Sequence, residues 1–143
     1  MHKSESMITQ EHVNKISYEI LGCAIRLHKA LGPGLLESVY KACFVKELEK
    51  AGLRYQTELR VPVIWEGTIL ETEYRLDVLV EELIVVELKS IENIMPVHMS
   101  QLLTYMKLIE KPKGLLINFY CVNIFKEGQK SLVNEYFAAL PKN

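Results

Sequence analysis

The segment YRLDVLVEELIVVELKS, residues 74–90, places charged side chains inside two apolar runs that read as neighbouring strands. Glu87 and Lys89 are two residues apart, so on one strand their side chains would share a face. Asp77 precedes them, on what would be the partner strand. A charge that enters a buried strand is costly unless a partner offsets it. These residues therefore indicate either a structural ion pair or a functional site.

Two carboxylates at neighbouring strand ends can bind a divalent cation. Mg²⁺ prefers oxygen ligands and commonly takes one or two carboxylates while keeping several waters. A lysine beside such a site can orient a metal-bound water or stabilise the charge of a phosphate. Together these groups suit phosphodiester hydrolysis. The alternative, a salt bridge on a solvated strand edge, uses the same residues.

The loop between the two runs decides whether the carboxylates meet. A two-residue turn at Glu81 and Glu82 would pair Asp77 with Val86 and point it away from Glu87. We therefore expect a longer loop, or a bulge near Asp77, which shifts the register by one residue.

Hydrophobic periodicity predicts the elements that must position these residues. Helices are expected at 10–31, with Thr9 as N-cap, at 35–51 and at 95–110. Strands are expected at 55–67, 68–80, 83–90 and 115–120, with Pro62 marking an edge strand or a bulge. A further strand at 121–128 and a short final helix complete the prediction. The order ααβββαβ favours an α/β fold with a mixed sheet of about four strands between helices.

Composition narrows the class of protein. The 143 residues, of which 49% are hydrophobic, fit one globular domain spanning 1–143. A net charge of −1 argues against a strongly basic nucleic-acid binder. No apolar run approaches the roughly 18 residues that span a bilayer. The three separated cysteines, Cys23, Cys43 and Cys121, suggest a reducing, cytoplasmic compartment. Phosphate-binding glycine loops and zinc-ligand spacings are not found.

Asp77 followed by Glu87-Leu88-Lys89 resembles the signature of the PD-(D/E)XK nuclease superfamily. The stretch GLLESVY, which contains Gly34, Glu37 and Tyr40, resembles the GxxExxY protein family of that superfamily. The segments HMSQLLTYMKL and GLLINF follow in the expected order, and the resemblance covers about residues 12–125. Leu76 replaces the proline that the literal motif places before its aspartate.

The resemblance implies a restriction-endonuclease-like αβββαβ core, a mixed central sheet flanked by helices, with the site at one edge. It implies a Mg²⁺-dependent nuclease, in which Mn²⁺ can substitute, acting on nucleic acid. Asp77 and Glu87 would bind the metal, the Leu88 carbonyl would be a third ligand, and Lys89 would position the attacking water. Glu37 would complete the acidic cluster.

Three further residues are candidates for contact with the substrate. Gln101 would reach the substrate or Lys89 from the helix after the sheet. His98 lies one turn before Gln101 and can line the same cleft. Tyr40 of the GxxExxY motif is either a substrate contact or a core residue whose hydroxyl finds one partner. Glu37 can also simply complement the dipole of its helix.

Two other functions fit the sequence. The chain can be a catalytically silent nuclease-fold module that binds nucleic acid or protein without metal. It can also be a structural oligomer, which an exposed apolar helix face around Val13, Ile16 and Ile20 would favour. Because cutting two strands often takes two active sites, a homodimer is a further expectation.

Overall fold

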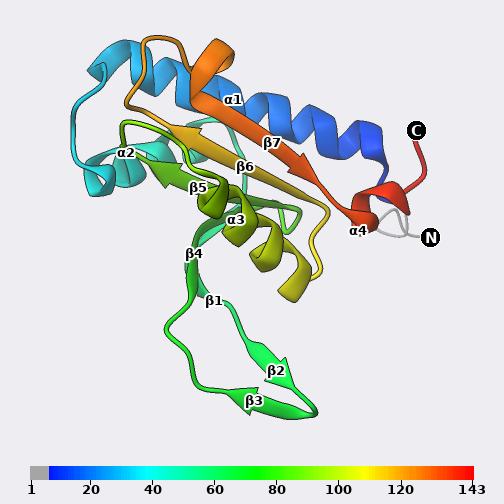
Figure 1. Ribbon diagram of the computed structural model, residues 1–143. Coiled ribbons are helices and arrows are strands. Elements are labelled where there is room, and N and C mark those ends of the chain that lie inside the picture. The colour runs from blue at the N-terminus through cyan, green and yellow to red at the C-terminus, as the bar shows by residue number, and fades with distance from the viewer. Residues whose placement is uncertain (1–6) are drawn as a thin grey trace.

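A computed structural model describes residues 7–143 (Figure 1). Its elements, in chain order, are α1 (Gln10–Leu31), α2 (Glu37–Lys50), β1 (Tyr55–Arg60), β2 (Val63–Trp65), β3 (Thr68–Leu70), β4 (Arg75–Val80), β5 (Ile84–Lys89), α3 (Pro96–Leu108), β6 (Lys113–Asn118), the π-helical turn η2 (Ile124–Gly128), β7 (Gln129–Val133) and α4 (Glu135–Ala138). Five strands form one sheet in the order β1-β4-β5-β6-β7. Only β5 and β6 run parallel within it. The predicted α/β class and mixed sheet are confirmed.

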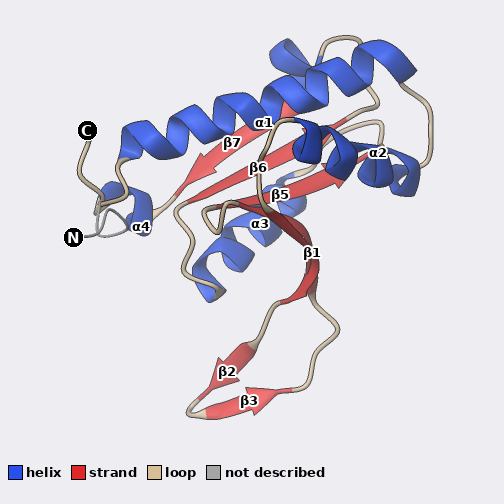
Figure 2. Cartoon of the chain, turned by 180° about the vertical axis from the view of Figure 1, so that it is seen from behind, coloured by secondary structure: helices blue, strands red, loops and turns tan. Residues whose placement is uncertain are grey.

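Helices cover both faces of the sheet. In Figures 1 and 2, α1 and α2 lie over one face and α3 over the other. The α1/α2 core lies beneath the first pair and comprises Val13, Ile16, Ile20, Cys23, Ala24, Leu27, Tyr40, Phe44, Leu48, Leu53, Val78, Val80, Ile84, Val86, Leu88, Leu115, Ile117, Phe119 and Ile124. The α3 core comprises Val61, Leu76, Leu79, Val85, Leu102, Tyr105, Met106 and Leu116. Within the described residues, no helix is long and apolar enough to cross a membrane.

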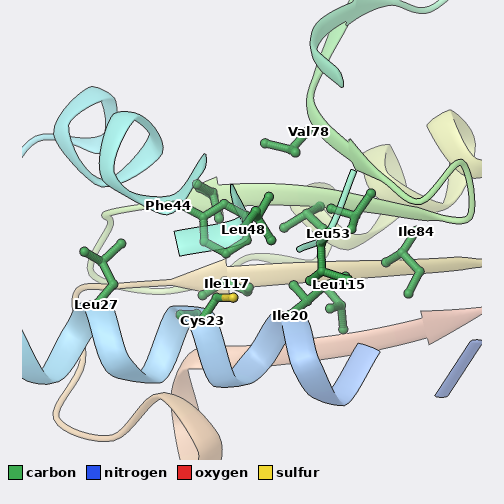
Figure 3. Packing of buried hydrophobic residues seen from close by; sticks show 14 of the residues in the cluster. Ile20, Cys23, Leu27, Phe44, Leu48, Leu53, Val78, Ile84, Leu115 and Ile117 are labelled. Carbon is green, nitrogen blue, oxygen red and sulfur yellow. The ribbon is translucent and has the colours of Figure 1, made fainter. Parts of the chain in front are cut away.

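Helix α1 begins and ends where the sequence predicts. The Thr9 hydroxyl accepts a hydrogen bond from the His12 N–H at 3.0 Å, and Gly32 ends the helix with a φ of 72°. The side chains of Ile20, Cys23 and Leu27 point from α1 into the core (Figure 3). The face that carries Val13, Ile16 and Ile20 is buried, so the exposed apolar face that would have favoured a structural oligomer is not found at these residues.

The region 55–80 departs from the prediction of two long strands. Each is interrupted, and the inner pieces β2 and β3 pair as a hairpin that projects from the sheet (Figures 1 and 2). Strand β1 ends at Arg60, two residues before Pro62, which lacks an N–H group, and the Val61 N–H still donates to the Tyr74 carbonyl at 2.9 Å. The outer pieces, β1 and β4, remain in the main sheet, and β1 is its edge strand as Pro62 suggested.

The strand predicted at 121–128 is wrong. This stretch contains the turn η2, which begins where the Asn123 side chain accepts the N–H of Lys126 at 2.8 Å. The fifth strand is instead β7, which pairs with β6. A side chain at Gly128 would clash with the Asn118 carbonyl oxygen, 2.7 Å from an added Cβ, so the close turn requires glycine. The short final helix is confirmed as α4.

Candidate active site at the ends of β4 and β5

The loop between β4 and β5 has three residues and sets the register of the site. Val80 pairs with Ile84 and Val78 with Val86, so the same register places Asp77 opposite Glu87. Two loop residues, Glu81 and Glu82, adopt left-handed φ values of 53° and 58° to close this turn. The expectation of a loop longer than two residues is confirmed.

Asp77 and Glu87 join the two strand ends through their side chains. The Asp77 N–H donates to Glu87 Oε2 at 2.9 Å, and the Leu88 N–H donates to Asp77 Oδ2 at 2.8 Å. Each carboxylate thus accepts a backbone N–H across the pair of strands. These two hydrogen bonds hold both carboxylates directly against the backbone of the opposite strand.

The strand β4 changes face at Asp77. Residues two apart on a regular strand share a face, yet Val78 belongs to the α1/α2 core and Leu76 to the α3 core. The backbone therefore twists at Asp77 itself. This twist changes the face of the strand, whereas the β4–β5 register is set by the three-residue loop and not by the bulge that was the other expectation.

The neighbouring strand β1 changes face at the same level. Tyr55 packs against the α1/α2 core and Leu59 against the α3 core, although four residues apart they should share a face. The residue between them that breaks the alternation is Glu58, with a left-handed φ of 51°. The β1–β4 register runs from Thr57 to Leu59 past Glu58, which lies beside Asp77.

Lys41 of α2 joins these two acidic residues. Its Nζ lies 2.8 Å from Asp77 Oδ1 and 2.6 Å from Glu58 Oε2. Neither Lys41 nor Glu58 was identified from the sequence. Lys41 had a usable signal, since it lies four residues after Glu37 and therefore on the same side of its helix. Glu58 had none, because only the fold reveals its backbone conformation.

The site carries more negative charge than its lysines neutralise. Burial, together with the negative charge of Asp77, raises the pKa of Glu87 to about 8, and this side chain is only 6% exposed. Burial and Asp77 also raise the pKa of Glu37, while Lys89 and Lys41 oppose the shift. Hydrogen bonds to Asp77 and Glu58 outweigh burial and raise the pKa of Lys41. A further cation would stabilise this group of carboxylates.

Tyr40 holds the loop that leads into α2. It is fully buried and stacks on Phe119 with ring centroids 4.3 Å apart. Its hydroxyl donates to the Gly32 carbonyl and accepts the Leu35 N–H at 3.2 Å. The Ser90 hydroxyl, just after β5, donates to the Leu35 carbonyl at 2.8 Å. Tyr40 thus positions the start of α2, which carries Glu37. Because its side chain is fully buried, Tyr40 is a core residue and not the substrate contact that was its other predicted role.

Helix α3 brings a different residue to the site than the one expected. Gln101 is exposed and has no hydrogen-bond partner among the described residues, so it does not contact Lys89 as one of the two expectations had it. Tyr105, one turn later, is 6% exposed, and burial and then the charge of Glu87 raise its pKa. His98 is half-buried at the helix start, where its Nδ1 accepts the Met95 N–H at 2.9 Å.

The predicted metal ligands fit a divalent cation. Among residues 7–143, no three carboxylate, histidine or cysteine side chains converge on one point, so Glu37 does not complete a three-residue cluster in this conformation. The predicted set needs only the carboxylates of Asp77 and Glu87 with one backbone carbonyl, and Mg²⁺ is commonly bound through one or two carboxylates. In this structure the Lys41 ammonium group forms a salt bridge with Asp77 and supplies a positive charge at one of these carboxylates.

Comparison with known proteins agrees with this geometry. The family model described as the PD-(D/E)XK nuclease superfamily matches residues 14–131, which include most of α1, every element from α2 to η2 and part of β7. Neither a curated protein nor a solved structure gives a significant match. The match covers most of the chain, and members of this superfamily generally use divalent metal ions and act on nucleic acid. The chain therefore belongs to the PD-(D/E)XK nuclease superfamily.

Proposed function

We propose that this protein is a metal-dependent nuclease that hydrolyses phosphodiester bonds, with Mg²⁺ as its ion and Mn²⁺ as a substitute. The observation that carries the proposal is the opposition of Asp77 and Glu87 at one end of the sheet, followed on the same strand by Lys89. Two fixed carboxylates with a lysine beside them are the groups needed to hold a cation and to act on a phosphate.

Each residue has a distinct task in this proposal. Asp77 and Glu87 would hold the ion together with the Leu88 carbonyl. A bound divalent ion would lower the pKa of a water and polarise the phosphate. Lys89 would orient that water and stabilise phosphate charge; its backbone is fixed where its carbonyl accepts the Phe119 N–H at 2.9 Å.

The substrate would approach from the side where Glu37 and α3 border the site. Glu37, half-buried in the first turn of α2, would hold the water network around the ion. Gln101 and His98 would contact the nucleic acid from α3. The exposure of Gln101 suits a direct contact with a phosphate or base more than a contact with Lys89.

Finer points of identity are also proposals. The chain fits the GxxExxY family, since Gly34, Glu37 and Tyr40 lie together at the start of α2 and the tyrosine secures the preceding loop. The free cysteines support a reducing, cytoplasmic compartment. One sheet shared by both cores supports a single domain over 1–143. A homodimer would serve cleavage of both strands of a duplex, and sedimentation would measure it.

A silent nuclease-fold module is the second candidate. The observation that favours it is the ion pair between Lys41 and Asp77, which occupies an oxygen that a metal would need. Such a module would bind nucleic acid or protein equally well with and without divalent ions, and its binding would survive Glu87→Gln.

A cleavage assay separates the two candidates. The purified chain is incubated with labelled single-stranded DNA, duplex DNA and RNA in Mg²⁺, in Mn²⁺ and in EDTA. A nuclease would cut at least one substrate only when an ion is present, and Glu87→Gln would stop it. Binding without cleavage under every condition would favour the silent module.

A further inference from the structure

We propose that Lys41 is an exchangeable internal cation that regulates metal binding: it bridges Asp77 and Glu58 when no metal is present, and it leaves Asp77 and keeps Glu58 when a divalent ion binds. The inference rests on the proposed function, because it concerns the same metal site. It assigns tasks to two residues that lie outside the PD-(D/E)XK pattern, one on α2 and one on the edge strand β1.

The geometry places one ammonium group between two carboxylates of different kinds. Lys41 Nζ is 2.8 Å from Asp77 Oδ1 and 2.6 Å from Glu58 Oε2. The Asp77 side chain is 13% exposed and is fixed by the Leu88 N–H, whereas the Glu58 side chain is 52% exposed. One carboxylate is therefore a fixed member of the site, and the other is a partner at its rim.

The backbone of Glu58 supports a functional reason for its position. Other non-glycine residues with positive φ, namely Glu66, Glu81, Glu82 and Glu110, lie in turns. Glu58 lies inside a strand, where a left-handed conformation costs energy and interrupts the pairing with β4. That conformation brings its carboxylate to Lys41 beside Asp77. A regular conformation at Glu58 would avoid this energetic cost. It would also keep the regular alternation of faces along β1, which is interrupted here beside the face change of β4.

Electrostatics determine what must happen when a metal arrives. A divalent ion on Asp77 would stand within a few ångströms of the ammonium group, where like charges repel strongly. Lysine has a flexible stem and can move its charge without moving the helix. Because Glu58 already contacts the ammonium, Lys41 can leave Asp77 without losing a carboxylate partner. Metal binding therefore competes with the Lys41–Asp77 pair, and Glu58 reduces the cost of that exchange.

A double-mutant cycle in metal binding tests the exchange. Mn²⁺ is titrated into the full chain and followed by water-proton relaxation, for wild type, Lys41→Met, Glu58→Gln and the double variant. We expect Lys41→Met to tighten Mn²⁺ binding on the order of tenfold, since it removes the competing charge. Glu58→Gln should weaken binding when Lys41 is present and change it little in the Lys41→Met background.

Two control variants isolate the contact from the charge change. Lys46→Met removes an exposed lysine of the same helix that has no salt bridge among the described residues, and it should bind Mn²⁺ as wild type does. Lys41→Arg keeps the charge and should remain as weak as wild type. If Lys41→Met does not fold, Lys41→Gln makes the same measurement with a polar side chain.

The outcomes distinguish this inference from the proposed function. If wild type binds Mn²⁺ but Lys41→Met binds no more tightly, the exchange is wrong and the metal site stands. If Glu58→Gln weakens binding equally in both backgrounds, Glu58 does not receive Lys41 and the exchange is again wrong. If no variant binds Mn²⁺ saturably, both the metal site and the exchange are contradicted.

Discussion

Asp77 and Glu87 face each other at the ends of β4 and β5, where their side chains replace backbone pairing between the strands. Each carboxylate accepts one backbone N–H of the opposite strand, which leaves one oxygen of Glu87 without a hydrogen bond from the described residues and one oxygen of Asp77 on Lys41. Glu87 Oε1 is therefore open to a cation, and Asp77 Oδ1 would become available if Lys41 moved away from it. The Asp77 and Glu87 carboxylates, which interrupt the two apolar runs, are thus held next to each other, an arrangement that suits a metal site.

Asp77→Asn should remove cleavage and leave the fold intact. Asparagine keeps an oxygen that can accept the Leu88 N–H but lacks the charge that holds a cation, so we expect the rate to fall at least about 100-fold. Circular dichroism should show the wild-type spectrum. Glu73→Gln changes an exposed acidic residue of the same region and should cut normally. Cleavage by Asp77→Asn at the wild-type rate would rule out this aspartate as a ligand.

The stability of the metal-free protein should fall as pH rises. The pKa of Glu87 is about 8 in the folded protein against an ordinary 4.5, so between these values the folded state binds more protons than the unfolded chain. The contribution is fully present below about pH 4.5 and is lost as pH rises through 8. Thermal unfolding in EDTA measures this, and Glu87→Gln should flatten the dependence.

The matched control for this pH profile is Glu71→Gln, which alters an exposed carboxylate and should keep the wild-type slope. A divalent ion should reverse the trend, because it displaces the proton and binds more tightly at pH 8 than at pH 6. A Glu87→Gln variant with the wild-type slope would show that another group is responsible.

Lys89→Met should separate catalysis from metal binding. The lysine is assigned to the attacking water and the phosphate, so the rate at saturating Mg²⁺ should fall on the order of 100-fold. Mn²⁺ binding should persist, because the carboxylates remain. Relaxation titration and a cleavage assay on the same preparation make the comparison. Loss of both properties together would place Lys89 among the groups that hold the site in shape.

Tyr40→Phe should weaken the fold and impair the site indirectly. The variant keeps the stack on Phe119 but loses the hydroxyl that joins the Gly32 carbonyl and the Leu35 N–H. We expect a loss of about 1–2 kcal/mol in the free energy of unfolding by urea. Tyr18→Phe, which removes the hydroxyl of an exposed tyrosine, is the control and should be neutral. Equal stability of both variants would remove the structural role given to Tyr40.

Much of the site could be predicted because its spacing is local. Two strands joined by a short loop leave few registers, and a simple two-residue turn would point Asp77 away from Glu87, so a longer loop or a bulge followed from the chemistry. The conformation of Glu58 could not be predicted, since nothing in its neighbours requires a left-handed residue there. Lys41 could have been placed beside Glu37 by helical spacing, but its contact with Asp77 depends on how α2 sits over the sheet, which no local pattern encodes.

The errors elsewhere have equally physical causes. Val122 and Ile124 alternate with polar residues as strand residues do, but the Asn123 side chain accepts a backbone N–H and starts a turn instead. Pro62 predicts an edge strand or a bulge; β1 is the edge strand, and beyond Pro62 the chain leaves the main sheet to form the separate β2–β3 hairpin. In both places a single side chain or a missing N–H outweighed the hydrophobic pattern.

The most direct test of the metal site is a Mn²⁺ titration of wild type beside Asp77→Asn, read by water-proton relaxation, since it requires no choice of substrate. We expect saturable binding by wild type and its loss in Asp77→Asn. Equal binding by the two proteins, or none by either at millimolar metal, would contradict the assignment of a divalent-ion site to Asp77 and Glu87.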